Sequence, residues 1–238
     1  MKRNAGKIIM GVTAFLLLAS SCKTLKKTSN RDKGVAIGAT SGAVIGGVIG
    51  NNVGNGKNTA VGAILGAVVG GVAGGIIGNK MDKQAEKIKD EIPGAKVERI
   101  GEGIRVTFDE NNPDGSKMGV YFETNKYNIS ANSQRAIAKM QDIFAEYPET
   151  NILIEGHTDD VGTDSYNMQL SKQRAEAVSA ALRNEGVASS RLITKWYGET
   201  EPVVENTSAA NRALNRRVEF VITANEKMKA DAKKEAGE

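Results

Sequence analysis

A carboxylate and a guanidinium lie close together at a predicted junction between a loop and a helix. Asp159 follows the apolar segment 152–155, and Arg174 lies in the helix expected at 167–184. At about 100° per residue, Arg174 and Asn167 fall on the apolar face of that helix. A cation at a core-facing position is costly unless another group satisfies it. The two residues therefore predict a receptor for a small zwitterion, in which Asp159 binds an ammonium group and Arg174 a carboxylate.

The same pair also allows a purely structural interpretation. A fixed salt bridge between Asp159 and Arg174 would join loop to helix without binding a ligand, since buried ion pairs are often retained for specificity. Breaking such a bridge would destabilise the domain by roughly 3 kcal/mol or more and would reduce binding only through unfolding. A ligand-binding pair would instead tolerate polar replacements of similar size.

Five motifs occur in order between residues 118 and 223. They read Gly156-His157-Thr158-Asp159, Asn167-x-x-Leu170-Ser171-x-x-Arg174-Ala175, Gly198-Glu199-x-x-Pro202, Asn206–Ser208 and Arg212-Ala213-x-Asn215-Arg216-Arg217-Val218-Glu219. Together they resemble the OmpA-like peptidoglycan-binding family, and their order makes the match more specific than any single motif. Two departures are Trp196, where the family usually has glycine, and the loose first-strand segment 121–124.

The resemblance implies a non-catalytic domain that binds the diaminopimelate of the peptidoglycan peptide stem through Asp159 and Arg174. The further candidate ligand-binding residues are Thr158, Asn167, Ser171 and Arg217. Period-two alternation in the last strand places Arg216 with its apolar face and Arg217 with Glu219 on the other face.

Enzymatic chemistry is not indicated by the sequence. His157 is the only histidine, which excludes a metal site with several His ligands, and no calcium loop is recognisable. Asp159 and Asp160 are adjacent and point in different directions, and no nucleophile motif lies near them. We expect His157 to support its loop by hydrogen bonding. No catalytic residue, metal ligand or cofactor is predicted.

The N-terminus has the pattern of a signal peptide over residues 1–21. Basic residues precede the apolar run 8–18, and residues 19–21 are small. Cys22, the only cysteine, follows as in a lipobox, although Leu18 lies one place earlier than the usual leucine. The alternatives are an ordinary secretory signal with an incidental cysteine, or an uncleaved anchor helix. We predict lipidation of Cys22, with several acyl chains anchoring the protein to a lipid membrane.

Glycine recurs at every fourth position through most of residues 34–78. A polar break at 51–58 divides two charge-free segments whose large residues are aliphatic. A spacing of four keeps glycine on one helix face, where two backbones can approach closely, so a helical hairpin is predicted at 34–79. Glycine costs about 1 kcal/mol per residue against alanine in a helix. The hairpin therefore needs a bilayer or a partner, such as a homo-oligomer, and the alternative is a flexible linker.

Strand and helix patterns alternate through residues 96–225. Expected strands are 96–99, 103–108, 119–122, 152–154, 192–197 and 217–223, and expected helices are 130–147 and 167–184. This order predicts an α/β (α+β) sandwich of the OmpA-like type, with helices on one face of a mixed sheet.

The complete predicted organisation has six segments. They are a signal peptide (1–21), a lipidated basic linker (22–33), the glycine-zipper hairpin (34–79), a charged connector (80–95), the OmpA-like domain (96–225) and a charged tail, frayed or disordered (226–238).

Charge and composition narrow the expected partners. The net charge of +4 is mild, and basic residues do not alternate with aromatic ones, so no nucleic acid is expected. The resemblance implies a lipoprotein that tethers the outer membrane to peptidoglycan, with its C-terminal domain in the periplasm. Lys23 favours the outer membrane, because Asp at this position is associated with inner-membrane retention in some bacteria. The alternative is an oligomeric membrane-inserting or envelope-assembly protein that acts through the zipper, with wall binding only positioning it.

Overall fold

The computed structural model describes residues 69–108, 119–120, 122 and 125–238. The elements are α4 (Gly71–Glu91), β1 (Ala95–Ile100), β2 (Gly103–Phe108), α5 (Ala131–Glu146), β3 (Thr150–Gly156), α6 (Asp164–Asn184), the 3-10 turn η1 (Ser189–Arg191), β4 (Leu192–Trp196), α7 (Ala209–Asn215), β5 (Val218–Ala224) and α8 (Glu226–Ala236). Within these residues no helix has both the length and the apolar character needed to cross a membrane. The predicted signal peptide, Cys22 and zipper residues 34–68 lie outside the described ranges.

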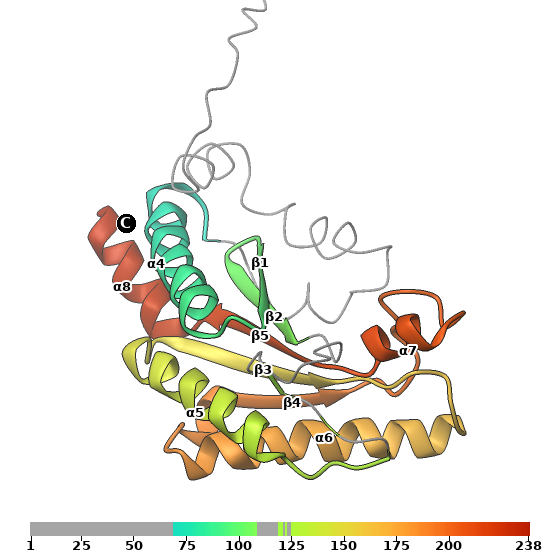
Figure 1. Cartoon of the computed structure of the whole chain (residues 1–238). Coiled ribbons are helices and arrows are strands. Elements are labelled where there is room, and N and C mark those ends of the chain that lie inside the picture. Colours follow the sequence, from blue (N-terminus) through green and yellow to red (C-terminus); the bar gives the residue numbers. More distant parts are fainter. Residues whose placement is uncertain (1–68, 109–118, 121, 123–124) are drawn as a thin grey trace, which may run out of the picture.

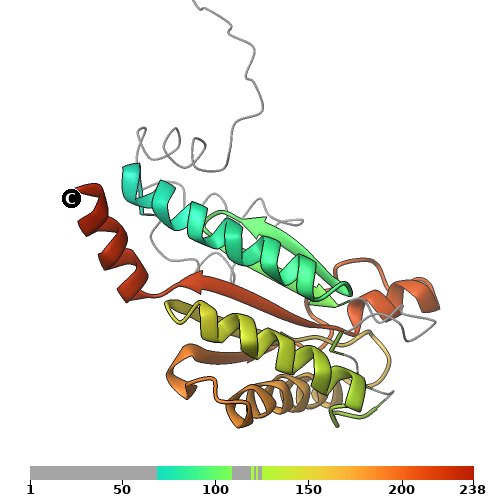
Figure 2. The same ribbon diagram turned by 60° about the vertical axis from the view of Figure 1, so that its left-hand side comes forward.

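The strands form one mixed sheet in the order β1-β2-β5-β3-β4, in which only the β3–β4 pair is parallel. Helices α4, α5, α6 and α8 share a single hydrophobic core with one face of this sheet. Figure 2 views the molecule from the side on which α4 and α5 lie. Figure 1 shows α7 apart from that layer, near the end of the sheet where β5 begins. The predicted fold class is therefore confirmed.

The register between β3 and β5 separates apolar from charged side chains. Ile154 lies opposite Phe220, and both belong to the core beneath the helices. Glu155 lies opposite Glu219 on the other face. A shift of one residue would reverse these faces, so burial of the apolar set fixes the register.

The two predicted helices form close to their expected positions. Ser130 caps α5 by accepting a hydrogen bond from the backbone N–H of Ser133. Thr163 caps α6 in the same way, so that α6 begins at Asp164, before the expected Asn167. Both caps satisfy backbone donors that the first turn of a helix leaves unpaired.

The core extends beyond residues 96–225 in both directions. Ile77 and Met81 of α4 are fully buried in it, and α4 packs against α8 and β1. The expectation of a frayed or disordered C-terminal tail is wrong, because Met228 and Ala232 bury a short apolar stripe of α8 against this core. The described end of the glycine-rich segment, including Gly78, forms the first turns of α4.

The strand expected at 119–122 is not present in the described residues of that segment. Gly119, Val120 and Phe122 have no strand structure, although Val120 is buried in the core. An apolar side chain can be buried without belonging to a strand. The local sequence pattern does not distinguish a buried strand from a buried segment that is not a strand.

The β1–β2 turn carries a carboxyl group that makes stability depend on pH. Burial raises the pKa of Glu102 to about 7, against an opposing hydrogen bond from the backbone N–H of Val69. The folded state therefore holds this proton more tightly than the unfolded chain, whose carboxyl titrates near 4.5. The contribution of Glu102 to stability is present at low pH, and it is lost as the pH rises from 4.5 to about 7.

We expect Glu102→Gln to remove part of the pH dependence of unfolding. Between pH values of about 5 and about 8, the wild type should lose the contribution of Glu102 to its unfolding free energy. The variant should not show this loss, so its unfolding free energy should rise relative to that of the wild type. Thermal unfolding followed by circular dichroism at both pH values measures the difference. Glu98→Gln, on the exposed side of β1, is the control that keeps the wild-type dependence. Equal pH dependence in Glu102→Gln and the wild type would contradict the assignment.

Candidate functional site

A small pocket of about 180 Å³ opens where β3 ends, α6 begins and α7 leads into β5. Its lining residues are Asn125, Thr158, Asp159, Val161, Asn167, Leu170, Arg174, Arg212 and Arg216. Four of the predicted site residues, Thr158, Asp159, Asn167 and Arg174, are thus brought together. The fifth and sixth, Ser171 and Arg217, do not line it.

Asp159 is fixed in the pocket by two hydrogen bonds to its carboxylate. The backbone N–H of Val161 donates to Oδ1 at 3.1 Å, and Nη1 of Arg216 donates to Oδ2 at 2.7 Å. The loop after β3 is therefore tied to the start of β5 by Asp159 and Arg216. Within the described residues this ion pair replaces the Asp159–Arg174 bridge that the sequence offered as a structural alternative.

Arg174 also lines the pocket and is buried, being only 3% exposed. Its Nε donates to the backbone carbonyl of Lys126 at 3.1 Å, and its guanidinium lies 5.2 Å from the ring centroid of Phe122. A guanidinium is planar, and its geometry matches that of a carboxylate. The predicted position of Arg174 on the buried face of α6 is confirmed.

Asn167 and Ser171 connect α6 to the loops around the pocket. The side-chain amide of Asn167 donates to the carbonyl of Asp159 at 3.2 Å and to Oε2 of Glu199 at 2.5 Å. The hydroxyl of Ser171 is fully buried and accepts from the backbone N–H of Gly198 at 2.9 Å. Ser171 thus holds the Gly198-Glu199 motif against α6, while Asn167 reaches the pocket itself.

Gly198 is required at this contact for two reasons. Its φ of +54° lies in the left-handed region, and a Cβ there would approach the backbone of Met168 to 3.0 Å. Its carbonyl also accepts a hydrogen bond from the backbone N–H of Thr158 at 2.8 Å. The second loop of the site is therefore joined to the first by main-chain atoms.

Arg217 lies on the opposite face of β5 from the Asp159 pocket, as the alternation predicted. Its Nε is 2.5 Å from Oε1 of Glu219, and its remaining nitrogens donate to the carbonyls of Asn215 and Glu201. It lines a second hollow of about 380 Å³. Arg217 was a predicted site residue, but Arg216 lines the pocket.

Arg212 and Arg216 were both missed as site residues. The signal for Arg216 was available, because strand alternation assigned it to the side of β5 that faces α6. Arg212 belongs to the same motif, one helical turn earlier in α7, and lines the same pocket. A basic pair at a spacing of four in the last motif indicates this shared face.

His157 is buried on the Arg217 side of the sheet and stacks on Tyr197, with ring centroids 5.2 Å apart. Among the described residues, neither ring nitrogen has a hydrogen-bond partner, so the prediction that this side chain supports its loop by hydrogen bonding is wrong. Burial lowers the pKa of His157 well below its usual value, and the charges of Arg217 and Arg105 lower it further. The imidazole is therefore neutral at physiological pH.

Glu155 lies beside His157 in an environment that also favours its neutral form. Burial raises the pKa of Glu155 to about 7, and the charge of Glu219 acts in the same direction. The hydroxyl of Tyr197 donates to Oε1 of Glu155 at 3.0 Å, which partly offsets the effect. Glu155, His157 and Glu219 thus lie together, with one side-chain ligand atom of each within 4.8 Å of the others.

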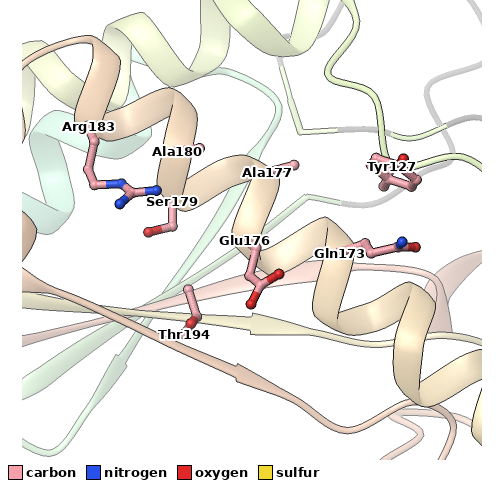
Figure 3. Close-up of a pocket in the computed structure, with 8 residues that line it drawn as sticks. All are labelled: Tyr127, Gln173, Glu176, Ala177, Ser179, Ala180, Arg183 and Thr194. Carbon is pink, nitrogen blue, oxygen red and sulfur yellow. The ribbon is translucent and has the colours of Figure 1, made fainter.

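A larger groove of about 570 Å³ follows the outer side of α6 and is shown in Figure 3. Its lining residues are Tyr127, Gln173, Glu176, Ala177, Ser179, Ala180, Arg183 and Thr194. Glu176 points towards Thr194, while Arg183 and Tyr127 lie at opposite ends of the groove. These polar groups do not converge on one point, so we place the candidate site in the smaller pocket, where charged groups do.

The charges of the pocket suit a small ligand that carries both an ammonium and a carboxylate. Among the described residues, one carboxylate (Asp159) and the guanidinium groups of Arg174, Arg212 and Arg216 line it. A carboxylate has about four lone-pair positions, so Asp159 retains acceptor capacity beyond its bonds to Val161 and Arg216. Guanidinium groups bind carboxylates in a bidentate geometry.

Comparison with known proteins relates both parts of the chain to described families. Residues 121–216 match the OmpA family, and residues 1–82 match the YMGG-like Gly-zipper. The outer-membrane lipoprotein YfiB of Pseudomonas aeruginosa is 31% identical over 116 residues, which cover 49% of this chain and 69% of YfiB. The peptidoglycan-associated lipoprotein of Buchnera aphidicola is also 31% identical, over 46% of this chain and 67% of that protein.

Other similar proteins match part of the chain. Outer membrane porin F of Pseudomonas fluorescens is 42% identical over 108 residues, so the chain spans about a third of its length, 33%. A solved structure of a putative MotB-like protein from Desulfovibrio vulgaris superimposes with a TM-score of 0.51 at 27% identity, covering 63% of this chain and 90% of that one. The ordered motifs, the mixed sheet with its helical layer and these relatives together show that the chain belongs to the OmpA family.

Proposed function

We propose that this protein binds peptidoglycan noncovalently and tethers the outer membrane to the cell wall, without catalysis. The observation that carries the proposal is the convergence of Asp159 and Arg174 on one small pocket from two different elements. A relative named as a peptidoglycan-associated lipoprotein supports the same role.

The ligand in this proposal is the diaminopimelate of the peptide stem. Its ammonium group donates to Asp159, whose orientation is set by Val161 and Arg216. Its carboxylate accepts from Arg174, and Arg212, which also lines the pocket, adds positive potential. Because the charged groups are preorganised by protein contacts, little side-chain entropy is lost when the ligand binds.

The membrane end of the tether is the N-terminal segment in this proposal. Acyl chains on Cys22 hold the protein in the outer membrane, and the domain lies in the periplasm. Relatives named as outer-membrane proteins and lipoproteins support this location. Incorporation of labelled fatty acid at Cys22 measures the anchoring directly. A homo-oligomer formed through residues 34–79 remains the basis of the alternative role in envelope assembly, which the glycine-zipper match supports.

Sedimentation of the detergent-solubilised full-length protein with purified sacculi tests the proposal. We expect Asp159→Asn and Arg174→Gln each to reduce the bound fraction by about tenfold or more, because one charged end of the ligand loses its partner in a partly dehydrated site. Both replacements keep polarity and approximate size. Free diaminopimelate should compete with the wall for the wild type.

Two variants serve as matched controls. Asp160→Asn removes a neighbouring exposed carboxylate, and Arg183→Gln removes an exposed cation from the same helix and from the larger groove. Both should sediment like the wild type. Wild-type binding by folded Asp159→Asn and Arg174→Gln would overturn the proposed site, and loss of binding in Arg183→Gln alone would move it to the groove.

A further inference from the structure

Three side chains capable of binding a metal ion meet on the sheet face opposite the helices. Glu155 and Glu219 are cross-strand neighbours on β3 and β5, and His157 follows Glu155 on the same side. One ligand atom from each lies within 4.8 Å of the others. The residues are only 2%, 5% and 2% exposed, in the order Glu155, Glu219 and His157.

The environment of the His157 imidazole indicates that a ligand binds here. Neither nitrogen of His157 has a hydrogen-bond partner in the part of the chain that the structure describes. Polar groups this deeply buried are almost always satisfied, because an unpaired one costs free energy. Its proximity to two carboxylates makes a cation a suitable partner, since a ring nitrogen that carries no proton offers a lone pair.

We propose that Glu155, His157 and Glu219 form a binding site for a divalent transition-metal ion of the zinc class. Zinc accepts mixed nitrogen and oxygen ligands, and sites with three protein ligands leave a fourth position for water. Metal–ligand distances of about 2.0–2.2 Å place neighbouring ligand atoms roughly 3.4 Å apart in a tetrahedron. The ligand atoms now lie within 4.8 Å of one another, so they would have to approach by up to about 1.4 Å to reach that geometry.

Neighbouring groups orient the three proposed ligands. The hydroxyl of Tyr197 holds Oε1 of Glu155 at 3.0 Å, and its ring stacks on His157. Arg217 holds Oε1 of Glu219 at 2.5 Å. Groups that fix the orientation of metal ligands in this way commonly change metal affinity by 10- to 100-fold.

The two arginines in the cluster set the expected strength of binding. Nε of Arg105 lies 3.2 Å from Oε2 of Glu219, close enough for an ion pair but not aligned for a hydrogen bond. Together with Arg217 it neutralises much of the negative charge, which weakens attraction for a dication. Glu219 still has lone-pair positions for a metal, because a carboxylate offers about four.

Calorimetric titration of the full-length, detergent-solubilised protein with zinc chloride, after removal of metals with a chelator, tests the proposal. We expect binding of one zinc ion per chain, with His157→Gln and Glu155→Gln each weakening it by at least about tenfold. Asp160→Asn, an exposed carboxylate outside the cluster, should bind like the wild type. Magnesium chloride should give no binding, because magnesium prefers oxygen ligands in octahedral geometry.

Arg105→Gln is expected to change zinc affinity in the opposite direction to the ligand variants. This result distinguishes binding in the cluster from binding to exposed acidic residues. Removal of that cation should strengthen zinc binding several-fold, because the local charge becomes more negative. Circular dichroism establishes that each variant is folded, and Glu155→Gln decides the question if His157→Gln does not fold. Absence of zinc binding in the wild type, or unchanged binding in both folded ligand variants, would overturn the proposal. The measurement needs no cell wall, so its outcome is independent of the proposed function.

Discussion

Replacing Gly156 by alanine is expected to destabilise the domain by about 3 kcal/mol, at the upper end of overpacking effects. A Cβ at this position would lie 2.2 Å from the backbone oxygen of Ser171 and 2.9 Å from its carbonyl carbon. No rotamer change relieves a clash with backbone, so β3 and α6 would have to move apart. Because α6 also carries Asn167 and Arg174, the pocket would be distorted together with the core.

Gly78→Ala is the matched control, with an expected effect of opposite sign. Gly78 lies inside α4, and no described atom is within 4 Å of the Cβ that alanine would add. Alanine is favoured over glycine in a helix by about 1 kcal/mol, so this variant should be more stable than the wild type. Chemical denaturation compares the two. An unfolding midpoint of Gly156→Ala at or above that of the wild type would contradict the close packing of β3 on α6.

Asn215→Ala is expected to lower the unfolding free energy by about 3 kcal/mol, because the buried side-chain amide of Asn215 makes several hydrogen bonds to the loop at residues 203–206. The Oδ1 atom of Asn215 accepts from the backbone N–H groups of Val203 and Val204 at 2.9 and 3.2 Å. Its Nδ2 donates to the carbonyl of Val204 at 2.8 Å and to Oδ1 of Asn206 at 2.7 Å. Asn215 is fully buried, so alanine would remove these partners at a point that water does not reach.

Asn211→Ala provides the comparison within the same short helix. Asn211 is half-buried, but its hydrogen bonds are exposed. Its amide donates to the carbonyl of Glu205 at 2.9 Å and to Oγ1 of Thr207 at 3.2 Å. Water can replace these bonds, so the cost should stay below about 1 kcal/mol. The difference between the two unfolding free energies is the quantity to measure. Similar values for both variants would show that burial of Asn215 does not determine its contribution.

The parts of the site that depend on local sequence were predictable. Asp159 was expected in a loop after a strand, and Asn167 and Arg174 on the buried face of a helix, because strand ends and helical periodicity involve only neighbouring residues. The structure has both arrangements. The strands expected at 96–99 and 103–108 were predicted for the same reason, and they form β1 and β2.

The partner of Asp159 was not predictable from such patterns. Arg216 is 57 residues away in the sequence and reaches Asp159 only because β5 inserts between β2 and β3. The environment of His157 likewise depends on Arg105 of β2 and on Arg217, which directly precedes β5. The order of strands in a sheet decides these contacts, and hydrophobic periodicity carries no information about that order.

Helix α8 escaped prediction for a different physical reason. Its buried surface consists of Met228 and Ala232, one turn apart in a strongly charged segment. With so few apolar residues, the sequence of this segment shows no clearer helical hydrophobic periodicity than that of a solvated tail. It becomes a stable helix because α4 supplies a complementary surface.

If the protein tethers membrane to wall as proposed, the central position of β5 has a mechanical consequence. The strand begins beside Arg216 at the pocket, ends at Ala224, and passes directly into α8, which packs on α4. Tension between a ligand in the pocket and the segment preceding α4 would therefore run lengthwise through β5. Its hydrogen bonds to β2 and β3 on both sides would be loaded together in shear, so they would have to break in concert and not one after another.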